Sequence, residues 1–456
     1  MVPGAFLPCR GIEVMDDVRD ALPAASPPLT ASAKLAYGLG DFGFGLSWNM
    51  VGAFLLFYYT DVALLPAAAV GTLLLVSRLA DAAVDPVIGI LVDRTRGRSG
   101  RARPWFKWGA VPFGLLCAAT FWMPPAGESP RLLWAVVTFG TLGILFSVVN
   151  IPYGALLPMM TNRNDERLTL GSLRAAGTAI SVIVATAATM PLVGLMGGGN
   201  QARGFVLVAA LFGLLTTLTT LNLLRCPEQV HAVEPLHREA IWPQVRAMIG
   251  NRAWNTVFLF ALLNFIRFGA VLAITPFFAI NVLGKPWMIS ILLPAVSGTL
   301  LIGSIIAPPY LRRMGMRRGN LIALLAALPL FALLPLTEAS TAGFLTLYFV
   351  GSILLSITMT AIFAMAAEAI EYHEQLTGTR NEGLLSSGIS LSTKIGMALG
   401  GALIAFGLAS IGYAPGKSGN GIVSGLRWLY YIPIVACLIA QMAVIARYPV
   451  IRRAVR

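Results

Sequence analysis

The feature that most constrains this 456-residue chain is its series of long apolar segments, separated by short polar breaks. Two of them, GAVLAITPFFAI at 269–280 and YYIPIVACLIAQMAVIA at 430–446, contain no charged residue. A helix that crosses a bilayer needs about 20 mainly apolar residues. A membrane β-barrel would instead show alternating segments of about 10 residues. The pattern therefore predicts an all-α membrane protein.

Composition supports this reading and excludes other classes of protein. Hydrophobic residues make up 57% of the chain and charged residues 12%, whereas a soluble domain has about 25% charged residues. So few charges cannot cover the surface of a soluble protein of this length. Disordered, collagen-like and coiled-coil chains need compositions that this one lacks. The cysteines are scattered and show no disulfide or metal-binding spacing.

Apolar segments lie on both sides of a polar stretch at 225–252 and predict six spans in each half. These are 36–60, 66–92, 105–124, 131–160, 168–195 and 203–224, then 254–283, 289–310, 319–336, 342–367, 384–411 and 422–446. We expect a cytoplasmic tail at 1–32, a six-helix bundle at 33–224, a cytoplasmic linker at 225–252, a second bundle at 253–446 and a basic cytoplasmic tail at 447–456. Two pseudo-symmetric six-helix bundles with a site between them form the major facilitator fold. The basic loops 93–104 and 312–318 occupy corresponding places in the two halves, although two ordinary cytoplasmic loops would look the same.

The basic residues predict the orientation of the chain. Most of the 33 Lys and Arg residues fall in tails and loops on the side of the termini, and the opposite side carries Arg131, Arg203, Lys285, Lys417 and Arg427. Basic residues accumulate in cytoplasmic loops. We therefore predict a multi-pass protein of a bacterial-type inner membrane with both termini in the cytoplasm. The net charge of +13 follows from this distribution, so we expect no nucleic-acid partner.

Two aspartates form the densest group of ionisable residues inside a span. Such residues cost about 2.5–3.5 kcal/mol near a helix centre and tend to mark function. Asp81 and Asp85 are four residues apart and so lie on one helical face. Two neighbouring carboxylates need a proton or a cation, which is what a cation-coupling site requires, and both would be metal ligands if the ion were Na⁺. The structural alternative is an Arg78–Asp81 salt bridge with Asp85 capping a kink at Pro86.

Basic residues in other spans have several possible roles. Arg174 and Lys394, one from each half, could neutralise the aspartates, bind substrate oxygens or extend to the membrane surface. Arg267, beside Asn264, could bind an anionic or oxygen-rich substrate, or it could form a structural ion pair. In NIPYGALLP (150–158), proline leaves backbone carbonyls without their helical hydrogen-bond partners. Together with Asn150, these carbonyls could bind a sugar or a cation. Alternatively, the segment could only pack against small residues of a neighbouring helix.

No pattern in the chain points to an enzyme. We expect His231, His237 and His373 to lie in loops, and neither HExxH nor a Walker A sequence is present. We therefore expect no catalytic activity and no cofactor other than a coupling ion.

Several motifs in order along the chain resemble one transporter family. They are LAYGLGDFG (35–43), SRLADAAVDP (77–86), NIPYGALLP (150–158), AAEAIEYHE (366–374) and STKIG (392–396). Together they resemble the glycoside–pentoside–hexuronide:cation symporter family over most of residues 34–446. The resemblance implies a twelve-helix major facilitator that couples uptake of a glycoside to Na⁺, H⁺ or a similar ion.

The family's coupling residues match this chain more fully than its sugar-binding residues do. The resemblance places the paired cation-site aspartates on Asp81 and Asp85, and the associated hydroxyl, arginine and lysine on Ser147, Arg174 and Lys394. At three sugar-binding positions, where the resemblance implies two aspartates and a tryptophan, this chain has Gly45, Asn150 and Gly154. At one cation-binding position, where it implies an asparagine, this chain has Val84. The missing oxygen at Val84 favours H⁺ over Na⁺, although Asn150 could replace it.

We therefore expect a secondary active symporter for a sugar or glycoside, acting as a monomer in membrane lipid. Its substrate site would draw on Asp41, Trp48, Asn49, Asn150, Tyr153, Arg174, Arg267 and Lys394. The cation site would use Asp81, Asp85, Ser147 and Asn150. The alternatives are a related cation-coupled transporter of a non-sugar solute, such as an amphipathic lipid, and a membrane sensor that does not transport.

Overall fold

The computed structural model describes residues 27–95, 100–229, 246, 248–377, 382–416 and 419–449. Within these ranges the chain forms twelve long α-helices. They are α2 (Ala31–Phe57), α3 (Ala67–Arg94), α4 (Arg103–Thr120), α5 (Glu128–Met160), α6 (Asn164–Gly197), α7 (Gln201–Asn222), α9 (Arg252–Asn281), α10 (Ile289–Met314), α11 (Met316–Leu333), α12 (Thr341–Thr377), α13 (Glu382–Ser410) and α14 (Asn420–Ile445). Most of the predicted tails and linker, with His231 and His237, lies outside the described residues.

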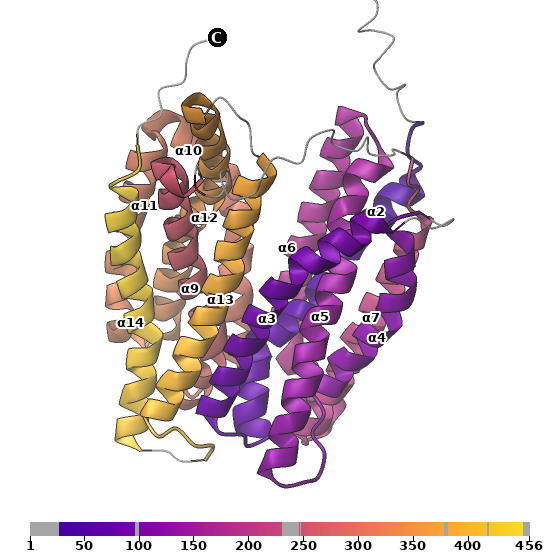
Figure 1. Cartoon of the computed structure of the whole chain (residues 1–456). Coiled ribbons are helices and arrows are strands. Elements are labelled where there is room, and N and C mark those ends of the chain that lie inside the picture. The colour runs from indigo at the N-terminus through magenta and orange to yellow at the C-terminus, as the bar shows by residue number, and fades with distance from the viewer. Residues whose placement is uncertain are drawn as a thin grey trace, which may run out of the picture.

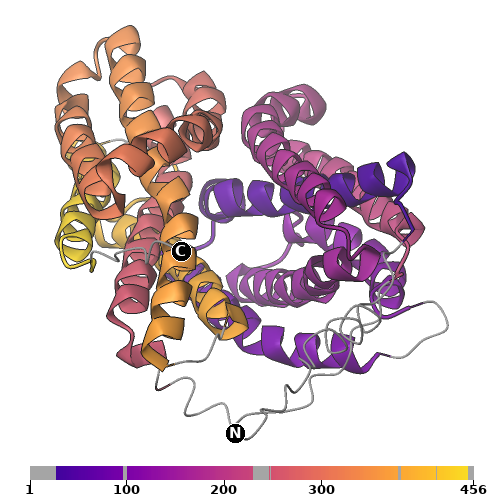
Figure 2. The same cartoon turned by 90° about the horizontal axis from the view of Figure 1, so that it is seen from above.

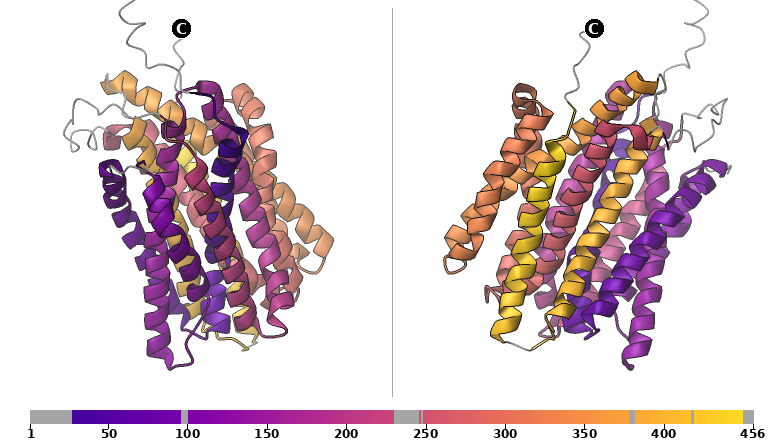
Figure 3. Two further views of the ribbon diagram at one scale, coloured as in Figure 1. Left: turned by 90° about the vertical axis from the view of Figure 1, so that its right-hand side faces the viewer. Right: turned by 60° about the vertical axis from the view of Figure 1, so that its left-hand side comes forward.

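The helices gather into two groups, α2–α7 and α9–α14 (Figures 1 and 2). Helix α2 begins and α14 ends at the upper edge of Figure 1, where the two groups stand apart. Toward the lower edge the groups come together, with α3 packed against α13, α6 against α10 and α2 against α9. The side views of Figure 3 show the helices running through the height of the molecule with short connections.

The outer surface of the helices suits a bilayer. Ten helices in the described part of the chain are long and apolar enough to cross a membrane; α2 and α4 are the other two of the twelve long helices. Large apolar side chains such as Leu133, Leu195 and Ile305 face outward and are exposed. This arrangement is expected where lipid rather than water surrounds the protein. The chain is therefore an integral, multi-pass membrane protein.

Local sequence explains how several helices begin and approach one another. Thr30 and Asn251 accept hydrogen bonds from the backbone N–H groups of Ala33 and Trp254 at the starts of α2 and α9. Gly400 on α13 lies against α9, and a Cβ at that position would come within 2.7 Å of the backbone nitrogen of Ala270. Small residues of this kind let membrane helices pack closely.

The predicted spans match the observed helices in order, but one expectation was wrong. Helix α12 continues to Thr377, ten residues beyond the predicted end of that span. His373 therefore lies in a helix rather than in a loop, and its side chain is buried. The helix continues through AAEAIEYHE, so His373 lies on its inward face. The prediction ended the span earlier because the hydropathy of the sequence falls in this segment.

Candidate functional site

The two aspartates on α3 share one partner on α5. The Ser147 hydroxyl lies 2.7 Å from Asp81 Oδ1 and 2.6 Å from Asp85 Oδ1. Asp81 and Ser147 are almost fully buried, with 3% and 2% of their surfaces exposed. The spacing of four residues places both carboxylates on the α3 face toward α5, as the sequence predicted.

A lysine from the other group of helices completes this cluster. The Lys394 ammonium, on α13, forms an ion pair with Asp85 and lies 3.9 Å from Asp81 Oδ2. Because α3 packs directly against α13, the ion pair joins the two groups of helices. Neutralising the aspartates is one of the roles that the sequence analysis offered for Lys394. The cluster of Asp81, Asp85, Ser147 and Lys394 is called the charge cluster below.

Arg78 does not form the salt bridge offered as the structural alternative. Its guanidinium lies 4.2 Å from the centre of the Trp48 ring, which in turn stacks on Phe146 at 4.0 Å. Among the described residues, Arg78 and Asp81 form no ion pair. A cation over an aromatic face is stabilised by the ring quadrupole, so the Trp48 ring is the contact that orients the Arg78 guanidinium.

A second polar group lies between α2, α5 and α6. Arg174 forms an ion pair with Asp41 at 3.7 Å, and the Thr178 hydroxyl donates to the same carboxylate. The Arg174 guanidinium also lies 5.0 Å from the centre of the Tyr153 ring. Arg174 thus pairs with an acid on α2 rather than with the α3 aspartates.

A small cavity lies where the two groups of helices meet. It measures about 50 Å³ and is lined by Arg78 and Phe139 from one group and by Gly269 and Met397 from the other. At the end away from the termini, the Tyr413 hydroxyl donates to Asp61 Oδ1 at 2.6 Å. Phe277, on α9, packs edge-on against both Phe57 and Tyr413 and closes the same end.

Comparison with known proteins shows which family this chain belongs to. The family described as MFS/sugar transport protein matches residues 36–452. The chain is 31% identical over 438 residues to the inner membrane symporter YicJ of Escherichia coli, covering 93% of this chain and 92% of that protein. It is 30% identical over 430 residues to the isoprimeverose transporter of Lactiplantibacillus pentosus, covering 91% and 88%. The chain belongs to the glycoside–pentoside–hexuronide:cation symporter family.

A solved structure agrees on the fold of this transporter. A bacterial homolog of the human lysosomal transporter Spinster, in an inward-facing and unoccupied conformation, superposes with a TM-score of 0.72 over 92% of this chain and 97% of that one. The two sequences are 14% identical, so this likeness concerns the fold alone. It supports the predicted major facilitator architecture.

Three further predicted site residues form no hydrogen bond or ion pair with the charge cluster among the described residues. Asn49 donates to the carbonyl of Gly45 in its own helix, at 2.7 Å. Asn150 is half-buried, one turn after Ser147 on α5. Arg267 lies inside the second group of helices beside Asn264. The roles assigned to all of these residues stay predictions.

Sequence reasoning missed several side chains that hold the site together. Thr178 follows Arg174 by four residues, so its place beside Asp41 could have been read from helical spacing. Phe146 gives no comparable signal, because an aromatic residue in an apolar span is ordinary. The contact between Asp61 and Tyr413 joins residues 352 positions apart and has no local signature.

Several oxygens in the charge cluster could bind a cation. The two carboxylates and the Ser147 hydroxyl present oxygens only, which suit Na⁺ or a proton rather than a transition metal. Within the residues described, no group of three or more His, Cys, Asp and Glu side chains is placed to hold a metal ion. Any cation bound here would therefore be held by few protein ligands.

Proposed function

We propose that this transporter couples the movement of a sugar or glycoside to the inward movement of H⁺ or Na⁺ by alternating access. The observation that carries the proposal is the shared Ser147 hydroxyl between Asp81 and Asp85, with Lys394 supplied by the other group of helices. A cation that binds the aspartates displaces the lysine, so cation binding is coupled to the contact between the groups. Membership of the family supports the same reading.

The geometry of Ser147 favours a proton over Na⁺. A serine hydroxyl has one hydrogen and can donate to only one carboxylate at a time. Both of its oxygen–oxygen distances are nevertheless short, at 2.7 and 2.6 Å. A proton on one carboxyl would let that group donate to Ser147 while Ser147 donates to the other. Val84, one residue before Asp85, offers no further oxygen for Na⁺.

The substrate would bind near the cavity between the groups. Asp41 and Arg174 offer hydrogen bonds to hydroxyl groups, and Trp48 would offer an aromatic face to a sugar ring once Arg78 moves off that face. This cavity measures about 50 Å³, below the volume of about 300–1,000 Å³ typical of ligand pockets. A glycoside would therefore extend beyond this cavity into the space between the groups.

The remaining features follow from the same proposal. The distribution of basic residues supports cytoplasmic termini, and the end closed by Asp61 and Tyr413 would then face outward. The chain would act as a monomer in an inner membrane, as a transporter without enzymatic activity and with no cofactor beyond the coupling ion. A non-sugar solute is the second candidate, because Gly45 and Gly154 stand where the family has sugar-binding side chains.

One screen tests both candidates. Purified transporter in proteoliposomes would be given radiolabelled glycosides, pentoses, uronides and a non-sugar solute such as an amphipathic lipid, with and without Na⁺ and at two pH values. We expect accumulation of at least one of these against its gradient, driven by an imposed pH or Na⁺ gradient. Failure of every sugar class, with accumulation of a non-sugar solute, would support the second candidate. Passive equilibration of all solutes would contradict symport.

A further inference from the structure

Arg267 carries a positive charge inside the second group of helices. It lies on α9 with 6% of its surface exposed, and its Nη2 donates to Asn264 Oδ1 at 2.9 Å. Gln441, on α14, donates to the same Asn264 oxygen at 3.4 Å. Both partners are neutral amides, and no carboxylate in the described part of the chain forms an ion pair with Arg267.

Such a charge requires compensation. An isolated ion in a low-dielectric interior is strongly unfavourable unless it is paired and hydrogen-bonded. A guanidinium also has five N–H donors, and the Nε of Arg267 has no hydrogen-bond partner among the described residues. At 6% exposure the side chain is too deeply buried for water to solvate it well. The surroundings of Arg267 thus lack a negative charge.

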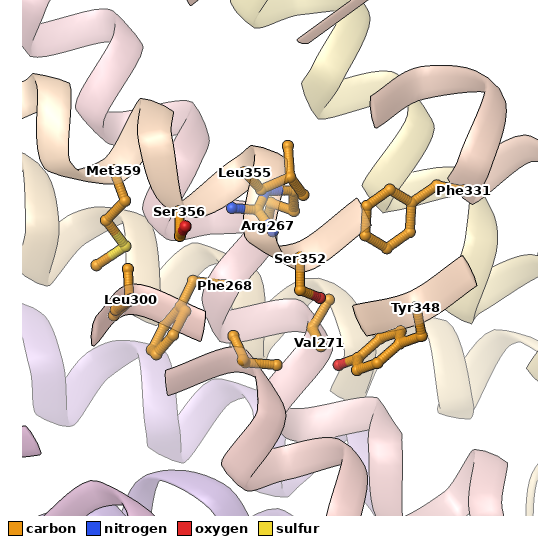
Figure 4. Close-up of a pocket in the computed structure, with 11 residues that line it drawn as sticks. Arg267, Phe268, Val271, Leu300, Phe331, Tyr348, Ser352, Leu355, Ser356 and Met359 are labelled. Carbon is orange, nitrogen blue, oxygen red and sulfur yellow. The ribbon is translucent and has the colours of Figure 1, made fainter. Parts of the chain in front are cut away.

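A cavity lies next to this guanidinium. It measures about 20 Å³ and is bounded by Arg267 with Phe331, Tyr348, Ser352, Ser356 and Met359. Figure 4 shows Arg267 among these side chains, and Ser352 lines the same cavity. A water molecule needs about 10–15 Å³ by the same kind of measure, so the cavity accepts one small ion or one to two waters. A sugar does not fit.

We infer that this cavity is a binding site for a small monovalent anion of the size of chloride. The anion would accept hydrogen bonds from the Arg267 guanidinium and from Ser352, whose hydroxyl makes no bond to another described residue. The negative charge of the anion would compensate the positive charge of Arg267, which no described carboxylate does. The site lies within the second group of helices and is separate from the charge cluster, which uses residues of α3, α5 and α13.

The direct test is halide binding to the purified transporter. We expect the thermal midpoint to rise by about 2 °C or more when chloride replaces gluconate at equal ionic strength, because a bound ion stabilises the folded state. Crystals grown in bromide should show an anomalous peak beside Arg267. Arg267→Gln should remove both effects, and Arg203→Gln, which removes an exposed charge at the start of α7, should retain both.

Three outcomes would overturn the inference. They are equal thermal midpoints of the wild type in chloride and gluconate, the same chloride response in the wild type and Arg267→Gln, and no bromide peak in the cavity. Arg267→Met gives an independent check if the glutamine variant folds poorly. If the cavity binds no anion, replacing the uncompensated charge with an apolar side chain should raise the thermal midpoint in both salts. None of these measurements depends on transport.

Discussion

The Lys394 ammonium contacts the Asp85 carboxylate across the interface between the two groups of helices, although the residues are 309 positions apart. Asp85 Oδ1 also accepts a hydrogen bond from the Ser147 hydroxyl at 2.6 Å. An ion that competes with Lys394 for this carboxylate therefore acts directly on the contact between α3 and α13. Coupling of this kind requires that cation and substrate each bind better when the other is present.

Asp85→Asn should abolish accumulation against a gradient while leaving exchange of substrate at equal concentrations. The amide keeps the size of the side chain but can neither bind a proton at neutral pH nor attract Lys394 as an anion. Gradient-driven uptake and counterflow in proteoliposomes would separate the two activities. Unchanged uphill transport in this variant would rule out Asp85 as the coupling residue.

Lys394→Met should destabilise the transporter, because it leaves the Asp85 carboxylate without its cation. Breaking a buried ion pair can cost 3–5 kcal/mol, but the side chains of Lys394 and Asp85 are 30% and 24% exposed, so we expect about 1–2 kcal/mol. Adding Asp85→Asn should restore most of the loss. Denaturant unfolding of the two single variants and the double variant gives the coupling energy. Additive losses would show that the ion pair contributes little.

Ser147→Ala should weaken cation binding more than it weakens folding. The change removes the one hydroxyl between Asp81 and Asp85 and leaves the buried Asp81 and the partly buried Asp85 with one partner fewer, at a cost of about 1–3 kcal/mol. If the cation-bound state loses a free energy of that size, the apparent affinity for the coupling ion falls by about 5- to 150-fold. Ser147→Thr keeps the hydroxyl and serves as the control. Ion titration of transport should show the threonine variant close to the wild type; equal losses in both variants would point to packing instead.

Tyr413→Phe should favour opening at the end away from the termini. The change removes the 2.6 Å hydrogen bond to Asp61 that joins the two groups, and bonds to a charged partner contribute about 1.5–3 kcal/mol. Spin labels on α2 and α9 near that end should report a longer mean distance.

Tyr431→Phe is the matched control for that prediction. Tyr431 donates to Glu338 at 2.9 Å, but both residues belong to the second group of helices. Its loss should leave the distance between the groups unchanged. If the two variants behave alike, the contact between Asp61 and Tyr413 does not hold this end closed.

Much of the architecture could be predicted from sequence because its causes are local. Long apolar runs must satisfy their own backbone hydrogen bonds in a bilayer, so segments such as 269–280 become helices wherever they pack. The proximity of Asp81 and Asp85 depends only on helical spacing. The place of His373 was missed because hydropathy falls before α12 ends.

The sequence by itself determined the twelve helices, their order and the face that carries the two aspartates. Only the tertiary structure decided which charges meet: Lys394 rather than Arg78 lies against the aspartates, and Arg174 pairs with Asp41. It also separated Arg267 from every described carboxylate and placed it beside a cavity. The physical reason is that these pairings depend on how α3, α6, α9 and α13 rotate and approach in space. Periodicity within one helix carries no information about the partner across the interface.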